Sequence, residues 1–393
     1  MEANIFDKFV SQKTLFKNKE NLRHNYRPTQ LPHRQEEIEK ISSEDLAKKL
    51  TIVDMHIDTP YRLWRQNLNG DEIDDISKRT LKGDFDYPRA VSGGLNVPFF
   101  SIYTPASTQI DSTSHEMAVS LISMIEDIVT LHSDKFFIVK STSDIELLDR
   151  ERLGIAFGME NGAPIEGDLS RVQFYHDKGI RYITLTHSKS NHISDSSYDE
   201  NHQWEGGLSS FGKELIREMN KVGIMVDISH VSDKAFYESI EISEVPVIAS
   251  HSSLRHFTPG FERNVSDDML IKLASKGGVI SINFGSSFLT KKALEYRRNR
   301  EGPYPFADVT DVVDHIDRVV NLVGIDHVGI GSDYDGVGDT LPSNLKDVST
   351  FPNLISELLT RGYTEEDIEK ILSGNIIRVW KEVEDFANGR KPV

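Results

Sequence analysis

The chain has 393 residues, of which 38% are hydrophobic and 27% are charged. This composition is that of a globular protein with a substantial core, and it excludes a collagen-like or wholly disordered chain. The 62 acidic and 45 basic residues give a formal net charge of −17, and no block of lysine and arginine interrupts the acidic excess, so we expect no nucleic-acid partner. Because the chain has no cysteine, it has no disulfide and no thiolate, and any metal must be held by His, Asp or Glu.

Neither end of the sequence carries a recognisable targeting signal. The beginning lacks the apolar stretch of roughly 7–15 residues typical of a signal peptide, and the polar C-terminus FANGRKPV is not a lipid-anchor signal. No apolar run approaches the ~20 residues of a membrane span. We therefore expect no membrane anchor and a cytoplasmic location, or a periplasmic or secreted one if a leader has been removed.

The N-terminal part differs from the rest of the chain. Residues 1–33 are polar and aperiodic, which predicts an extension, and the segment HRQEEIEKISSEDLAKKL that starts at His33 predicts a charged helix. We expect residues 34–393 to form a single domain.

Eight short apolar, β-branched runs predict strands at 50–58, 95–104, 154–160, 181–187, 223–230, 245–251, 277–284 and 327–333. Amphipathic patterns between them predict helices at 115–132, 169–179, 211–223, 266–277 and 307–324. Strands that alternate with helices indicate βαβ units and a parallel sheet. Eight such units predict an α/β fold, a TIM-like (β/α)8 barrel with an N-terminal extension and extra C-terminal helices. A doubly wound open sheet is the alternative.

Seven of the eight predicted strands end in a polar residue. In chain order these are Asp58, Thr104, Glu160, His187, His230, His251 and Asp333. Because the C-terminal ends of barrel strands open onto one shared mouth, this placement predicts a functional site there.

Several of these residues have the chemistry of metal ligands. His56 and Asp58 lie on one face of the first predicted strand, since side chains alternate with a period of two, and together they can hold one cation. Glu160 can bridge two cations with its two oxygens, or be a turn residue. His230 and His251 end consecutive predicted strands, which suits two neighbouring imidazole ligands.

The remaining candidates have roles in catalysis or substrate binding. His187 can donate to a substrate carbonyl oxygen as negative charge develops. Asp333 is placed to take a proton from an activated water, with Asp335 as its rival. Arg263 follows the sixth predicted strand and can bind a substrate carboxylate in a bidentate pair, or form a surface salt bridge.

Eight motifs together resemble the membrane (renal-type) dipeptidase family of binuclear zinc peptidases. They are, in the family's order, VDMHIDTP, GMENG, YITLTHS, VDISHVS, PVIASHSS, RNVSDDML, HVGIGSDYDGV and GNIIRVWKEVE, and they cover most of the chain. The resemblance leaves a homodimer open. The signal peptide, cysteines and lipid-anchor signal of the family's secreted animal members are absent, which argues against membrane attachment and a disulfide-linked dimer.

The resemblance implies a TIM-like barrel with two zinc ions at its mouth. By motif, His56 and Asp58 match ligands of the first zinc, Glu160 matches the bridging carboxylate, and His230 and His251 match ligands of the second. His187 matches the substrate-binding histidine, Arg263 the arginine for the substrate's C-terminal carboxylate, and Asp333 the catalytic aspartate. Mn²⁺ or Co²⁺ fits the same ligands.

The implied activity is hydrolysis of free dipeptides with a C-terminal L- or D-residue by a metal-bridging hydroxide. Two alternatives remain open from the sequence. One is another amidohydrolase that acts on cyclic amides or β-lactam-like substrates, and the other is a non-catalytic metal-binding protein on the same scaffold. The presence of both His187 and Asp333 disfavours the non-catalytic alternative.

Overall fold

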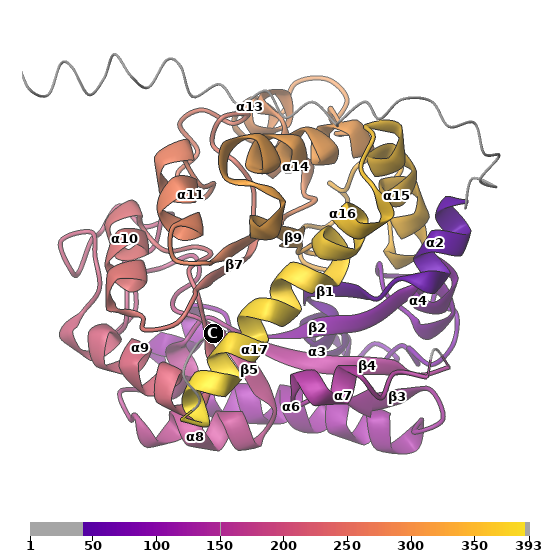
Figure 1. Cartoon of the computed structure of the whole chain (residues 1–393). Coiled ribbons are helices and arrows are strands. Elements are labelled where there is room, and N and C mark those ends of the chain that lie inside the picture. Colours follow the sequence, from indigo (N-terminus) through magenta and orange to yellow (C-terminus); the bar gives the residue numbers. More distant parts are fainter. Residues whose placement is uncertain (1–41, 150, 390–393) are drawn as a thin grey trace, which may run out of the picture. The chain divides into compact units, whose positions relative to one another are not determined.

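The computed structural model describes residues 42–149 and 151–389, which belong to one compact unit (Figure 1). The predicted extension at 1–33, and the first part of the helix predicted from His33, lie outside the described residues. No helix in these two ranges is long and apolar enough to cross a membrane.

The strands form one parallel barrel sheet in the order β1 (Ile52–Ile57), β2 (Leu95–Tyr103), β4 (Leu153–Glu160), β5 (Ile180–Thr184), β6 (Met225–Asp227), β7 (Ile248–Ser252), β8 (Val279–Ile282) and β9 (Val328–Ile330). A further strand that was not predicted, β3 (Phe136–Ile138), pairs with β4 outside this order. The chain beyond β9 returns to β1, where the Asp333 N–H donates to the His56 carbonyl at 3.0 Å and the Asp58 N–H donates to the Tyr334 carbonyl at 2.8 Å. The predicted TIM-like barrel is confirmed, and the open sheet is not formed.

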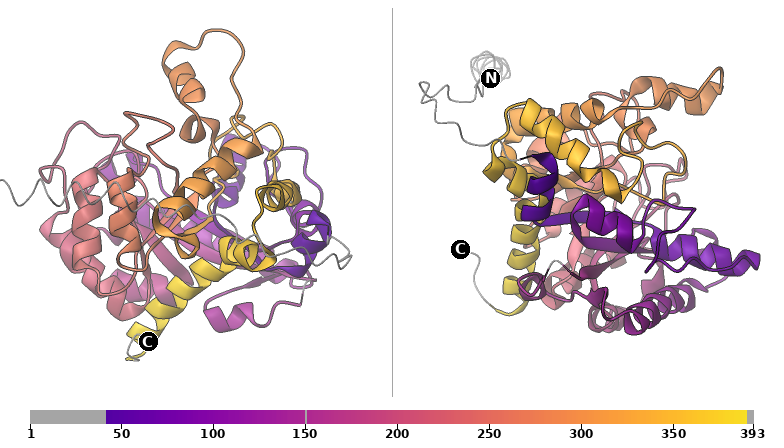
Figure 2. Two further views of the ribbon diagram at one scale, coloured as in Figure 1. Left: turned by 45° about the horizontal axis from the view of Figure 1, so that its top comes forward. Right: turned by 90° about the vertical axis from the view of Figure 1, so that its right-hand side faces the viewer.

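Helices follow the strands in the predicted alternation (Figures 1 and 2). They are α2 (Ser43–Lys49), α3 (Thr59–Asn69), α4 (Tyr87–Gly93), α5 (Ser107–Ile110), α6 (Ser114–Leu131), α7 (Thr142–Ile145), α8 (Ser170–Asp177), α9 (Ser210–Val222), α10 (Asp233–Ile242), α11 (Asp267–Ala274), α12 (Ser286–Leu289), α13 (Lys291–Asn299), α14 (Val309–Val323), α15 (Phe351–Thr360), α16 (Glu365–Glu369) and α17 (Asn375–Ala387). The described part of the helix predicted from His33 is α2, and the other predicted helices correspond to α6, α8, α9, α11 and α14. The unpredicted α10 begins after Ser232, whose hydroxyl caps the Ala235 N–H.

The helix α17 closes one end of the barrel (Figure 1). Its buried residues Val379, Trp380 and Val383 belong to one apolar cluster with residues at the beginnings of strands, such as Val53 of β1 and Val97 of β2. The N-terminal end of the barrel is therefore filled with apolar side chains, and the polar strand ends lie at the opposite end.

Most strands are shorter than predicted. β5 ends at Thr184, β6 at Asp227 and β9 at Ile330, so that His187, His230 and Asp333 lie in the loops that follow. The Asp227 carboxylate accepts the backbone N–H of Ser229 at 3.0 Å, which turns the chain out of the strand. His230 then adopts a left-handed backbone conformation with φ of 71°.

Candidate active site and metal centre

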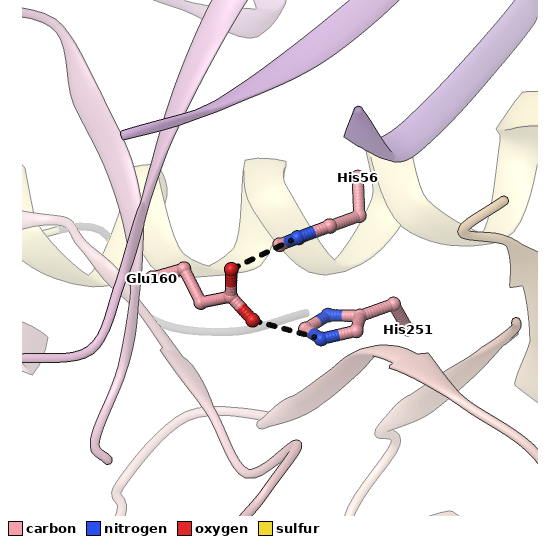
Figure 3. Close-up of side chains that lie close together, drawn as sticks. All are labelled: His56, Glu160 and His251. Atoms are coloured by element: carbon pink, nitrogen blue, oxygen red, sulfur yellow. Dashed lines mark ion pairs between the residues drawn. The ribbon is translucent and has the colours of Figure 1, made fainter. Parts of the chain in front are cut away.

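The predicted ligands converge on Glu160, at the end of β4. Its Oε1 lies 3.1 Å from Nε2 of His230, 3.2 Å from Nε2 of His251 and 3.5 Å from Nε2 of His187. Its Oε2 lies 3.4 Å from Nε2 of His56. In Figure 3 the two oxygens face His56 and His251 separately, so the carboxylate can serve two centres at once.

Hydrogen bonding fixes which nitrogen of His56 faces the cluster. Nδ1 lies 2.8 Å from the Tyr182 hydroxyl, and that hydroxyl donates its own proton to the Met55 carbonyl at 3.0 Å. The hydroxyl oxygen therefore accepts, Nδ1 carries the proton, and Nε2 presents a lone pair. Nε2 is buried and has no hydrogen-bond partner among the described residues.

His251 is held in the same tautomer by a different arrangement. Its Nδ1 lies 2.7 Å from the Ser250 hydroxyl, which donates to Oδ2 of Asp227 at 2.6 Å. The hydroxyl again accepts from Nδ1, so the lone pair of His251 is on Nε2. Nε2 of His251 lies 2.9 Å from Nε2 of His230, and both nitrogens face Oε1 of Glu160.

The carboxylates of Asp58 and Asp333 complete the cluster beside His56. Nε2 of His56 lies 3.5 Å from Oδ2 of Asp58, and one oxygen each of Asp58 and Asp333 lies within 4.8 Å of a nitrogen of His56. Oδ1 of Asp58 is buried without a hydrogen-bond partner in the described chain. Oδ2 of Asp333 accepts the Asn283 side-chain amide at 2.7 Å, a contact that the sequence did not predict.

Gly336 packs directly against these two carboxylates. A Cβ atom at this position would lie 2.1 Å from Oδ1 of Asp333 and 2.2 Å from Oδ2 of Asp58. The backbone of the loop after β9 therefore forms part of the wall of the cluster, and it leaves no room for a side chain.

The shifted pKa values of the histidines reflect burial and neighbouring charges. Burial and the positive charge of Arg263 lower the pKa of His230 well below its ordinary value, and burial also lowers that of His251. For His56 the effect of burial is outweighed by Tyr182, Glu160 and Asp58, and the pKa is raised well above its ordinary value. Negative charge that attracts a proton to Nε2 of His56 attracts a metal cation equally.

The carboxylates are shifted in opposite directions. Burial alone raises the pKa of Glu160, but the surrounding imidazoles outweigh it and hold the pKa well below its ordinary value. Burial and the negative charge of Asp58 raise the pKa of Asp333 well above its ordinary value. Three converging carboxylates at a buried site require positive charge among them.

This donor set fits metal binding. Carboxylate oxygens and imidazole nitrogens are ligands of Zn²⁺, Mn²⁺ and Co²⁺. The unpartnered Nε2 of His56 and Oδ1 of Asp58 point to a cation rather than to internal hydrogen bonding. Among the described residues, three sets of side chains are arranged to hold an ion, and all three belong to this cluster. The sets are His56 with Glu160 and His251, Glu160 with His187 and His230, and His56 with Asp58 and Asp333.

The cluster lies at the bottom of a cavity of about 950 Å³. Aromatic side chains that the sequence analysis did not single out form part of the wall, namely Tyr61, Tyr103, Tyr198, Phe288 and Tyr304. His187 also lines the cavity, with its ring edge-on to that of Tyr103 at 4.7 Å between centroids. The side chain of His187 is 21% exposed, in contrast to His56 at 0%, so it is accessible from the cavity.

Arg263 lies beside the cavity and is not one of its lining residues. Its Nη1 donates to the Ser252 hydroxyl at 2.6 Å and its Nη2 to the His251 carbonyl at 2.8 Å. Its Nε is buried without a partner in the described chain, and the guanidinium lies 5.4 Å from the centroid of Phe288, a residue of the cavity wall. The alternative of a surface salt bridge is wrong, since Arg263 is buried.

Asp335, the rival of Asp333, is engaged elsewhere. Its Oδ2 accepts from Nε of Arg62 at 2.9 Å and from the Thr59 hydroxyl at 2.7 Å, and its Oδ1 accepts the Asp84 N–H at 2.6 Å. These hydrogen bonds connect α3 and the loop that follows it to the segment after β9.

The family model of the membrane dipeptidases (Peptidase family M19) matches residues 41–392. Dipeptidase tcpJ of Claviceps purpurea is 35% identical over 330 residues, which cover 81% of this chain and 74% of that protein. Dipeptidase 3 of Mus musculus is 32% identical over 355 residues, which cover 88% of this chain and 68% of that protein.

Solved structures share the fold. The probable dipeptidase PvdM from Pseudomonas aeruginosa superimposes with a TM-score of 0.76 at 26% identity, covering 88% of this chain and 98% of that one. A metallopeptidase from Rhodobacter sphaeroides, solved with a phosphinate mimic of the dipeptide L-Ala-D-Ala, superimposes with a TM-score of 0.73 at 24% identity, covering 85% of this chain and 99% of that one.

Proposed function

Since the chain belongs to the membrane dipeptidase family, peptidase family M19, and is therefore a metal-dependent peptide-bond hydrolase, we propose that it cleaves free dipeptides with an L- or D-residue at the carboxyl end, using two zinc ions. The observation that carries this proposal is the position of Glu160, whose two oxygens face separate sets of imidazoles. A single carboxylate with this geometry suits a pair of cations.

The ligands divide into two groups around Glu160. His56 and Asp58 would hold the first cation, and His230 and His251 the second. Cations bound here would supply Lewis acidity toward a water molecule and toward the scissile carbonyl.

Asp333 is the proposed base. Its carboxylate lies beside Asp58 at the bottom of the cavity, and Asn283 orients it through the 2.7 Å hydrogen bond. Positive charge held in the cluster would lower the pKa of Asp333 and favour the anionic form, which accepts a proton from the attacking water. The same proton is then available for the leaving amine.

His187 is the proposed donor to the substrate carbonyl oxygen. It lines the cavity 3.5 Å from Glu160, and burial lowers its pKa, so the ring is neutral near pH 7. A neutral imidazole whose Nε2 carries the proton can donate to an oxygen on which negative charge develops. His187 thereby stabilises the transition state more than the substrate.

Arg263 is the proposed anchor of the substrate's C-terminal carboxylate. Its unpartnered Nε and its position against Phe288 support this role. Its hydrogen bonds to the Ser252 hydroxyl and the His251 carbonyl hold the guanidinium in place beside the cavity.

The test is amine release from L-Ala-L-Ala, L-Ala-D-Ala and L-Ala-L-Ala-L-Ala by the full chain, first treated with a chelator and then with added zinc. Cleavage of both dipeptides but not of the tripeptide, restored by zinc, is the expected result. Equal cleavage of the tripeptide would contradict the restriction to dipeptides. No cleavage by folded, metal-loaded protein would contradict the proposal and direct attention to cyclic amides and β-lactam-like substrates.

A further inference from the structure

The cavity continues well beyond the metal cluster, along a surface that we call the outer wall. The outer wall is formed by Arg65, Gln66 and Asn69 of α3, by Asp71 and Lys82 of the loop before α4, and by Arg297 of α13. The purple segment that contains α3 and the orange segment that contains α13 project on the same side of the barrel (Figure 2, right).

Three of these residues are cations without an acidic partner. Arg65, Lys82 and Arg297 are exposed, and none of them forms an ion pair with any residue in the described ranges. Arg62, a fourth cation of the cavity, differs because Asp74 and Asp335 neutralise it at 2.6 and 2.9 Å. The unpaired cations come from three separate segments, so their convergence on one cavity is a property of the fold.

Little negative charge opposes them. Among the acidic residues that line the cavity, Asp58, Glu160 and Asp333 belong to the metal cluster, and Asp335 is bound to Arg62. Asp71 is the acidic residue left on the outer wall. The outer wall therefore carries three unpaired cations and one carboxylate, an excess of positive charge, whereas the whole chain has a net charge of −17. A cleft lined by one sign of charge concentrates ligands of the opposite sign.

We propose that the outer wall selects dipeptides with an acidic side chain, aspartate or glutamate, over their neutral counterparts. This inference rests on the proposed dipeptidase function and adds the substrate class to it. The cavity volume of about 950 Å³ is at the upper end of the range for small-molecule sites, so a side chain that extends from the cluster to the outer wall has room.

The experiment uses isosteric pairs on the zinc-loaded full chain. Values of kcat/KM are measured for L-Ala-L-Glu against L-Ala-L-Gln, and for L-Asp-L-Ala against L-Asn-L-Ala. We expect the acidic member to be favoured about tenfold in at least one pair, and the favoured pair identifies which end of the substrate faces the outer wall. In the triple variant Arg65→Gln, Lys82→Gln, Arg297→Gln this ratio should fall toward one.

Lys276→Gln is the matched control. Lys276 is exposed, lies just before β8 at the opposite end of the barrel, and carries the same charge, so its removal should leave the ratio unchanged. Equal rates within both pairs, or a ratio that the triple variant does not alter, would overturn the inference and leave the dipeptidase function standing. Absence of cleavage for all four peptides and also for L-Ala-L-Ala would overturn both.

Discussion

The metal cluster and the outer wall belong to one cavity but are built in opposite ways. In the cluster every side chain except that of His187 is buried, and each contacts several others, as Glu160 does with four imidazoles. On the outer wall, Arg65, Lys82 and Arg297 are exposed and lack acidic partners. Substitutions in the cluster should therefore have large, non-additive effects, whereas those on the outer wall should be small and separable.

The largest effect is expected for Glu160→Gln. An amide removes the charge that both sets of ligands share, so metal content should fall and turnover should drop by several orders of magnitude. Metal analysis by mass spectrometry, together with the rate on L-Ala-L-Ala, checks this. Glu166→Gln is the control, since this residue of the segment that follows β4 pairs with Arg171 outside the cluster. Full metal occupancy in Glu160→Gln would show that the carboxylate is not a shared ligand.

Asp333→Asn separates catalysis from metal binding. The variant keeps an oxygen near the cluster but cannot accept a proton, so kcat should fall by roughly 10²–10⁴-fold while metal content is retained. Asp335→Asn should instead lower the melting temperature, because it disrupts the contacts to Arg62 and Thr59. A near-normal kcat in Asp333→Asn would remove this residue from the proposed mechanism.

Ser250→Ala tests the support of His251. Without the hydroxyl between His251 and Asp227 the tautomer is no longer fixed, and zinc affinity should fall about 10–100-fold. Isothermal titration of metal-free protein with zinc measures it. Ser281→Ala is the matched control, because Ser281 is also fully buried in the barrel but its hydroxyl has no described partner. An equal loss in both variants would mean that the effect is one of packing.

The smallest effect concerns salt and the outer wall. Raising the ionic strength from about 0.1 to 1 M shortens the Debye length from roughly 10 to 3 Å. The preference for L-Ala-L-Glu over L-Ala-L-Gln should therefore decline a few-fold, because the cations involved are exposed. Steady-state kinetics at several salt concentrations checks this, and a preference that stays constant would show that it arises from a buried group.

Much of this architecture is predictable from local sequence patterns. Alternating apolar runs predict the barrel, and polar residues at the strand ends, such as Asp58 and Glu160, predict a site at its mouth. The partners of the ligands are not predictable in this way. The contact between Tyr182 and His56, and that between Asn283 and Asp333, depend on the register between strands and on side-chain rotamers, which a single strand does not encode.

The burial of Arg263 has the same explanation. Its neighbours Ser252 and Phe288 come from other segments, so the sequence favoured neither a wall position nor a surface one. The outer wall is harder still to predict, because Arg65, Lys82 and Arg297 carry no motif and meet only through the fold.

The hydrogen bonds that close the barrel between β1 and the chain after β9 have a consequence for the order of folding and metal uptake. His56 and Asp58 are translated early and Asp333 late, yet the hydrogen bonds that join β1 to the chain after β9 also bring these three residues together. A nascent chain that lacks the last strand cannot assemble this part of the cluster. Tight metal uptake should thus coincide with completion of the fold, and a chain arrested during synthesis would not compete with finished molecules for the ion.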